Sequence, residues 1–182
     1  MKAFFLALLE VVEIAAIVIA TILVIRFFLF QPFLVSGGSM EPTFINGDYL
    51  VVDQLTYRFR EPSRGEVVVF KNEEGTYFIK RVIALPGDTI NVSDGTVKVT
   101  ASGASEATVL SEPYLGDRVS TNGDTDLVLR DGEYFVMGDN RSYSYDSRSW
   151  GALDSEQIVG LVRVRLWPVT SARAFFAPQY AL

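Results

Sequence analysis

The sequence predicts a mainly β protein, an antiparallel sandwich or barrel, preceded by a single N-terminal transmembrane helix. The chain is overwhelmingly apolar from residue 4 to residue 35. Beyond it, turn signals such as Asn-Gly, Pro-Gly and Asp-Gly separate short runs rich in β-branched and aromatic residues. Many short strands at such spacing favour an antiparallel fold over alternating helices and strands.

The apolar N-terminal segment is long enough to cross a bilayer, whose core of about 30 Å requires roughly 20 helical residues. We expect residues 1–10 to be a short cytoplasmic N-terminus, 11–30 the anchor and 31–182 the extracytoplasmic β domain. Glu13 and Arg26 lie near the two ends of this anchor, where charged side chains reach the interface. A cleaved signal peptide has a shorter apolar core and a small-residue cleavage site, and a buried soluble helix is the other alternative.

The β domain contains six strand-like runs, at residues 49–52, 66–70, 77–85, 96–100, 133–137 and 159–167. Residues from about 92 to 132 are expected to form a smaller, hairpin-rich insertion. In "LVRVRLW" the alternation predicts that Arg163 and Arg165 face solvent. The apolar tail "AFFAPQYAL" either packs in the core or makes a second contact with lipid.

The composition excludes several classes of protein. A net charge of −6 over 182 residues argues against nucleic-acid binding. The absence of cysteine rules out disulfides, thiolate catalysis and cysteine-based zinc sites, and the absence of histidine removes the commonest general base. The sequence gives no basis for a metal or another cofactor.

The stretch "SGGSMEPT" places Ser39 in a glycine turn, as for a nucleophile, and a serine hydroxyl then needs a base beside it. The chain has four lysines. Lys2 is separated from Ser39 by the anchor, and Lys71 and Lys98 lie in hairpin-like segments that are expected to be exposed to solvent. Lys80 lies instead in the apolar strand "YFIKRVIAL".

In that strand Phe78, Lys80 and Val82 share one face, so either Lys80 or Arg81 points toward a core or a cleft. Burial disfavours the ammonium and lowers the lysine pKa. Two interpretations of Lys80 stay open on residue type alone: a general base, or a structural lysine whose stem packs while its amine reaches water.

Five segments occur in the order "SGGSMEPT", "GDYLVVDQLTYRF", "RGEVVVFKN", "YFIKRVIALPGDTI" and "MGDNRSYSYDSRSWG". Together they resemble the sequence boxes of bacterial type I signal peptidases, from the anchor through "VGLVRVRLWP". The resemblance implies the signal peptidase fold and a membrane-bound serine endopeptidase that removes signal peptides after small residues, typically Ala-X-Ala. It also implies that Ser39 is the nucleophile and Lys80 the general base. Relatives in the endoplasmic reticulum use histidine in place of this lysine.

The resemblance assigns supporting roles to the segment that follows Gly138. Ser144 would orient the Lys80 amine through a hydrogen bond. Asp139, Asp146 and Arg148 would form ion pairs that hold the loop.

The oxyanion hole is expected to use the backbone N–H of Ser39, alone or completed by water. Some family members have a serine two residues before the nucleophile, and this chain has Gly37 there. Ser36 lies one place further back.

Shallow apolar pockets are implied for the small substrate residues, lined by Phe33, Val35, Met40, Phe44, Phe78 and Ile79. Core packing is the alternative for each. Phe44 replaces the leucine usual in the family, and the larger ring would narrow the first pocket, favouring glycine or alanine over serine.

The expected partners are signal peptides of exported preproteins and membrane lipid, with no nucleic acid, and the expected state is a monomer. The expected location is the cytoplasmic (plasma) membrane, crossed once. Two other functions stay open: a Ser–Lys self-cleaving repressor, and an inert membrane-tethered β domain that binds peptides or lipids.

Overall fold

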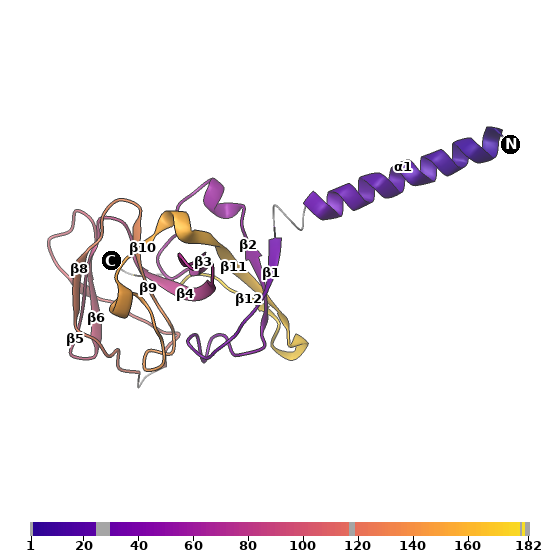
Figure 1. Ribbon diagram of the computed structural model, residues 1–182. Coiled ribbons are helices and arrows are strands. Elements are labelled where there is room, and N and C mark those ends of the chain that lie inside the picture. The colour runs from indigo at the N-terminus through magenta and orange to yellow at the C-terminus, as the bar shows by residue number, and fades with distance from the viewer. Residues whose placement is uncertain (1, 25–29, 117–118, 179, 181–182) are drawn as a thin grey trace.

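The computed structural model describes residues 2–24, 30–116, 119–178 and 180. It consists of one long helix, α1 (Lys2–Val24), followed by a β domain, from which the helix projects in Figure 1. The prediction of mainly antiparallel sheets after one long apolar helix is confirmed.

Helix α1 contains the one stretch, within the described part of the chain, that is long and apolar enough to span a membrane. This stretch is Phe4–Leu23, 20 residues with a mean hydropathy of 2.5. It begins before the predicted anchor at 11–30 because Glu10 and Glu13 lie inside a continuous helix and do not mark its start. Residues 25–29, the last part of the predicted anchor and the site of Arg26, lie outside the described residues.

The larger sheet is antiparallel throughout, with the strand order β1-β2-β11-β3-β4-β9-β10 and β12 paired to β11. In chain order its strands are β1 (Phe30–Leu34), β2 (Tyr49–Asp53), β3 (Val67–Lys71), β4 (Tyr77–Ala84), β9 (Glu133–Met137), β10 (Leu153–Asp154), β11 (Ile158–Trp167) and β12 (Arg173–Ala174).

A second antiparallel sheet, of order β7-β6-β5-β8, overlaps the region predicted as an insertion but begins before residue 92, with β5, and it lies away from α1 in Figure 1. Its strands are β5 (Thr89–Ser93), β6 (Thr96–Thr100), β7 (Thr108–Val109) and β8 (Thr125–Val128). The short helical segments are α2 (Ser147–Trp150), η2 (Thr56–Arg58), η3 (Ser155–Gln157) and η4 (Val169–Ser171).

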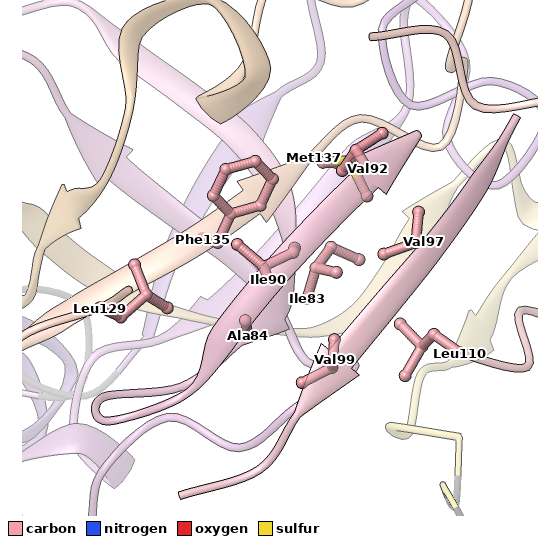
Figure 2. Packing of buried hydrophobic residues seen from close by; sticks show 10 residues of the cluster. All are labelled: Ile83, Ala84, Ile90, Val92, Val97, Val99, Leu110, Leu129, Phe135 and Met137. Carbon is pink, nitrogen blue, oxygen red and sulfur yellow. The ribbon is translucent and has the colours of Figure 1, made fainter. Parts of the chain in front are cut away.

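Three hydrophobic clusters form the core. One joins the two sheets: Figure 2 shows Ile90 and Val99 of β5 and β6 gathered with Phe135 and Met137 of β9. The other two lie on opposite faces of the larger sheet, because successive strand residues point to opposite faces. On β3, Val69 belongs to one cluster and Val68 to the other. The neighbouring strand β4 is thus covered on both faces.

The prediction that Arg165 faces solvent is wrong. The residue is 7% exposed, and its Nη1 donates to Asp48 Oδ2 at 2.8 Å and to the Thr43 carbonyl at 3.2 Å. β11 has register shifts against β2 between Val162 and Val164 and between Arg165 and Trp167, so a simple alternation does not predict which of its side chains are buried. Arg163, by contrast, is half-exposed and pairs with Asp53 at 3.0 Å.

Candidate active site

The turn that carries Ser39 is closed by backbone hydrogen bonds at its base. The Val35 N–H donates to the Asp48 carbonyl at 2.9 Å, and the Gly47 N–H donates back to the Val35 carbonyl at 3.0 Å. Gly37 has a φ of 96°, a conformation that glycine adopts without a steric penalty. Gly37, two residues before Ser39, is therefore required by the shape of the turn.

A second segment, residues 138–140, holds the Ser39 turn from the other side. The Asn140 N–H donates to the Ser39 carbonyl at 3.0 Å, and Asn140 Nδ2 donates to the Gly38 carbonyl at 3.0 Å. Gly138 lies so close that a Cβ at this position would overlap the Ser39 carbonyl oxygen and the Ser144 side chain. Neither Gly138 nor Asn140 was assigned a role from the sequence, although both lie in "MGDN", which begins the last of the five segments.

Lys80, on β4, is brought to the Ser39 hydroxyl. Its Nζ lies 2.9 Å from Ser39 Oγ and 3.0 Å from the carbonyl oxygen of Ile79. The lysine is 3% exposed, so its amine is removed from water although the side chain carries an ionisable group. The alternation of the strand predicted that either Lys80 or Arg81 points inward. Both are buried, since both faces of β4 are covered.

The environment of Lys80 favours the neutral amine. Burial lowers the pKa of Lys80 from 10.5 to about 8, although the negative charges of Asp146 and Asp139 act in the opposite direction. At pH 8 about half of the molecules then carry a neutral amine, compared with well under one in a hundred for a free lysine.

The two nearby carboxylates are each held by an arginine. Asp139 accepts from Arg81 Nη2 at 2.6 Å and from Arg81 Nε at 2.8 Å. Asp146 accepts from Arg148 at 2.8 Å and from the Gly138 N–H at 3.0 Å. Burial acts to raise the pKa of Asp146, but these donors outweigh it and the pKa lies below the ordinary value. The ion pairs expected of Asp139, Asp146 and Arg148 are thus present, with Arg81 as a partner that the sequence did not indicate.

The hydrogen bond expected between Ser144 and Lys80 is not formed. Ser144 Oγ is buried and makes no hydrogen bond of ordinary geometry within the described residues, although it lies near enough to Asp146 to help lower the pKa of that carboxyl. The hydroxyl lies against Gly138, next to the Ser39 turn. An orienting role for Ser144 stays a prediction.

The residues predicted to line the substrate pockets separate into two groups. Val35, Met40 and Phe44 belong to one cluster, and Phe33 and Ile79 pack against it. Within this cluster Phe44 is 0% exposed, and its ring centroid lies 4.4 Å from that of Phe175 in the C-terminal tail.

Phe78 lies apart from this group, on the other face of β4. Its ring stacks on Phe70 at a centroid distance of 5.7 Å and packs against the cluster that contains Tyr134 and Val136. Phe78 and Ile79 therefore cannot belong to the same wall of one pocket.

Comparison with known proteins identifies relatives over most of the chain. Residues 8–167 match the family model described as signal peptidase, peptidase S26. The chain is 38% identical over 152 residues to probable signal peptidase I-2 of Synechocystis sp., an alignment that covers 80% of this chain and 66% of that protein. It is 37% identical over 171 residues to signal peptidase I of Bacillus licheniformis, covering 87% of this chain and 89% of the relative. A crystal structure of a signal peptidase I from Enterococcus faecalis V583 matches with a TM-score of 0.47 and 28% identity, covering 56% of this chain and 97% of that chain.

Proposed function

The chain belongs to the signal peptidase I family of serine peptidases, peptidase S26, and we propose that Ser39 is its nucleophile and Lys80 its general base. Signal peptidases of this kind cleave the signal peptides of preproteins. The observation that carries the assignment of residues is the 2.9 Å contact between Lys80 Nζ and Ser39 Oγ, at hydrogen-bonding distance for proton transfer.

In the first half of the reaction the neutral amine of Lys80 accepts the hydroxyl proton of Ser39 as Oγ attacks the scissile carbonyl carbon. When the C–N bond breaks, the Lys80 ammonium returns this proton to the leaving nitrogen, which becomes the new N-terminus of the mature protein. The signal peptide is left as an ester on Ser39.

In the second half Lys80 accepts a proton from water as the water oxygen attacks the ester carbonyl. The C–O bond to Ser39 then breaks, Oγ regains a proton from Lys80, and the signal peptide leaves as a carboxylic acid that releases its remaining proton to water. One group thus acts as base and acid in each half, which requires a pKa near the working pH.

The oxyanion that forms in both halves needs a preorganised donor. The Ser39 N–H makes no hydrogen bond to the residues that the structure describes. The Gly37 N–H, by contrast, donates to Asn46 Oδ1 at 3.1 Å. These observations support the Ser39 N–H as the donor in a backbone-based hole.

The preference for small residues before the cut is assigned to the wall on the Ile79 face of β4. Phe33 and Ile79 are partly buried there, and the Phe33 ring contacts Tyr77 at a centroid distance of 5.2 Å. In this proposal the large apolar side chains at this wall restrict the pocket to substrate residues about the size of alanine.

Helix α1 supports a membrane-bound enzyme, since its apolar side chains are exposed along its length. We assign it to the cytoplasmic membrane as a single span, with the β domain on the extracytoplasmic side in contact with lipid and the enzyme working as a monomer. Protease treatment of intact spheroplasts, which digests the β domain only if it lies outside, tests the orientation. Light scattering in detergent tests the monomer.

The assignment of the two residues is tested with purified full-length protein in detergent and a preprotein substrate. Ser39→Ala and Lys80→Ala are each expected to abolish cleavage at the signal peptide junction. Ser105→Ala and Lys98→Ala, which make the same chemical changes in the second sheet and its loop, are the matched controls. Cleavage that survives in Lys80→Ala at near the parent rate rules out Lys80 as the base.

A further inference from the structure

The face of β4 opposite the Ile79 wall has a hollow that the proposed reaction does not use. Its volume is about 330 Å³. Phe70 and Phe78 form its floor, and Trp150 and Tyr145 belong to its walls. Glu73 and Glu74, in the turn between β3 and β4, complete its rim.

The hollow begins close to the proposed catalytic pair. Lys80 Nζ lies 5.8 Å from the centroid of the Phe78 ring and 2.9 Å from Ser39 Oγ. An extended chain advances about 3.3 Å per residue, so the hollow lies two to three residues from the bond that Ser39 would attack.

The position of the hollow also indicates which part of the substrate reaches it. The small residues before the cut are assigned to the Phe33 and Ile79 side of β4, and Phe78 points to the other side. In an extended peptide, the residues before the cut contact the Phe33 and Ile79 wall. Beyond the Ser39 hydroxyl, the residues after the cut therefore lie at the Phe78 side of β4.

The chemistry of the hollow fits a cationic side chain. The faces of Phe78 and Trp150 attract cations, and Tyr145 is largely exposed and able to close over a ligand. Glu73 and Glu74 are exposed, and neither forms an ion pair within the described residues. An acidic side chain at the same place would meet two like charges.

We propose that this hollow is a subsite for a lysine or arginine side chain located two or three residues after the scissile bond. The subsite rests on the proposed function of Ser39 and Lys80, and it adds a preference on the mature side of the cut. Because both carboxylates are exposed, each contributes modestly, and we expect a total effect of about three- to tenfold.

The test uses peptides with a fixed Ala-X-Ala junction and lysine, alanine or glutamate at the second or third position after the cut. They are cleaved by the purified full-length enzyme at pH 9, where Lys80 is largely neutral. Lysine is expected to raise kcat/KM about three- to tenfold over glutamate at one of the two positions, and Glu73→Gln/Glu74→Gln to remove the difference. The control Glu106→Gln/Asp126→Asn makes the same charge change in the second sheet and its β6–β7 loop, and it is expected to retain the difference.

A binding measurement separates this inference from the proposed mechanism. Fluorescence anisotropy of the same peptides on Ser39→Ala should show the preference for lysine without any cleavage, and its loss when the two glutamates are also replaced. A parent enzyme that fails to cleave overturns the catalytic assignment, whereas the binding preference still decides on the subsite. Equal binding of the lysine and glutamate peptides, or a preference that persists without the two glutamates, overturns the subsite.

Discussion

Replacing Lys80 with methionine is expected to stabilise the protein near neutral pH while abolishing its peptidase activity. Like lysine, methionine has an unbranched side chain, so it fills the space of the lysine stem without introducing a charge. Burial lowers the pKa of Lys80 from 10.5 to about 8. At 1.36 kcal/mol per pKa unit, holding the ammonium in the folded protein costs about 3 kcal/mol at pH 7.

The gain in stability depends on pH in a defined direction. The folded protein releases the Lys80 proton near pH 8 and the unfolded chain near pH 10.5. Between these values the unfolded chain binds more protons, so the free energy of unfolding of the parent rises with pH. The advantage of Lys80→Met is therefore about 3 kcal/mol below pH 8 and disappears as the pH rises toward 10.5.

The assay is urea unfolding of full-length parent and variant in the same detergent, followed by tryptophan fluorescence at pH 7, 8, 9 and 10. Lys98→Met, in the second sheet, is the control and should change the free energy of unfolding by less than about 0.5 kcal/mol at each pH. In parallel, kcat/KM of the parent should rise with pH and reach half its maximum near pH 8. A variant that is less stable than the parent at pH 7, or a difference that does not change with pH, refutes the buried neutral amine.

Three further predictions concern the surroundings of the pair. Asp139→Asn leaves the Arg81 guanidinium buried without its counterion and should lower the free energy of unfolding by about 3–5 kcal/mol; a loss below 1 kcal/mol in urea unfolding contradicts the ion pair. Gly138→Ala should reduce kcat at least tenfold while the protein stays folded, because the added methyl displaces the Ser39 carbonyl; unchanged single-turnover rates would show that the turn tolerates it. Ser36→Ala should leave kcat/KM within tenfold of the parent, because the exposed Ser36 makes no side-chain hydrogen bond within the described residues; a larger loss would give the oxyanion hole a side-chain donor.

Much of the fold could be predicted from the sequence because its signals are local. The apolar composition of the N-terminal run is enough to predict the long helix α1. Strands β3 and β4 lie within one residue of the predicted runs 66–70 and 77–85. The resemblance to signal peptidases, which rested on five ordered segments, is confirmed by the family match over residues 8–167.

What the sequence missed depends on contacts between distant segments. Arg165 was expected in solvent because an alternating strand resembles one with a wet face, but its partner Asp48 lies 117 residues away. Likewise, nothing in "YFIKRVIAL" indicates that Arg81 pairs with Asp139. Local alternation tells which residues share a face, and only the assembled sheet tells what covers that face.

The lowered pKa of Lys80 is set mainly by burial, which acts against two nearby carboxylates. A carboxylate close to a lysine amine favours the ammonium and would raise its pKa. Asp139 and Asp146 act in this direction. Each carboxylate, however, accepts a bidentate pair of hydrogen bonds from an arginine, Arg81 or Arg148, whose charge compensates its own. Burial can then dominate, and the pKa falls to about 8. A histidine base, with an ordinary pKa near 6.5, needs no such arrangement. Using lysine for the same task requires burial deep enough to outweigh the carboxylates beside the amine.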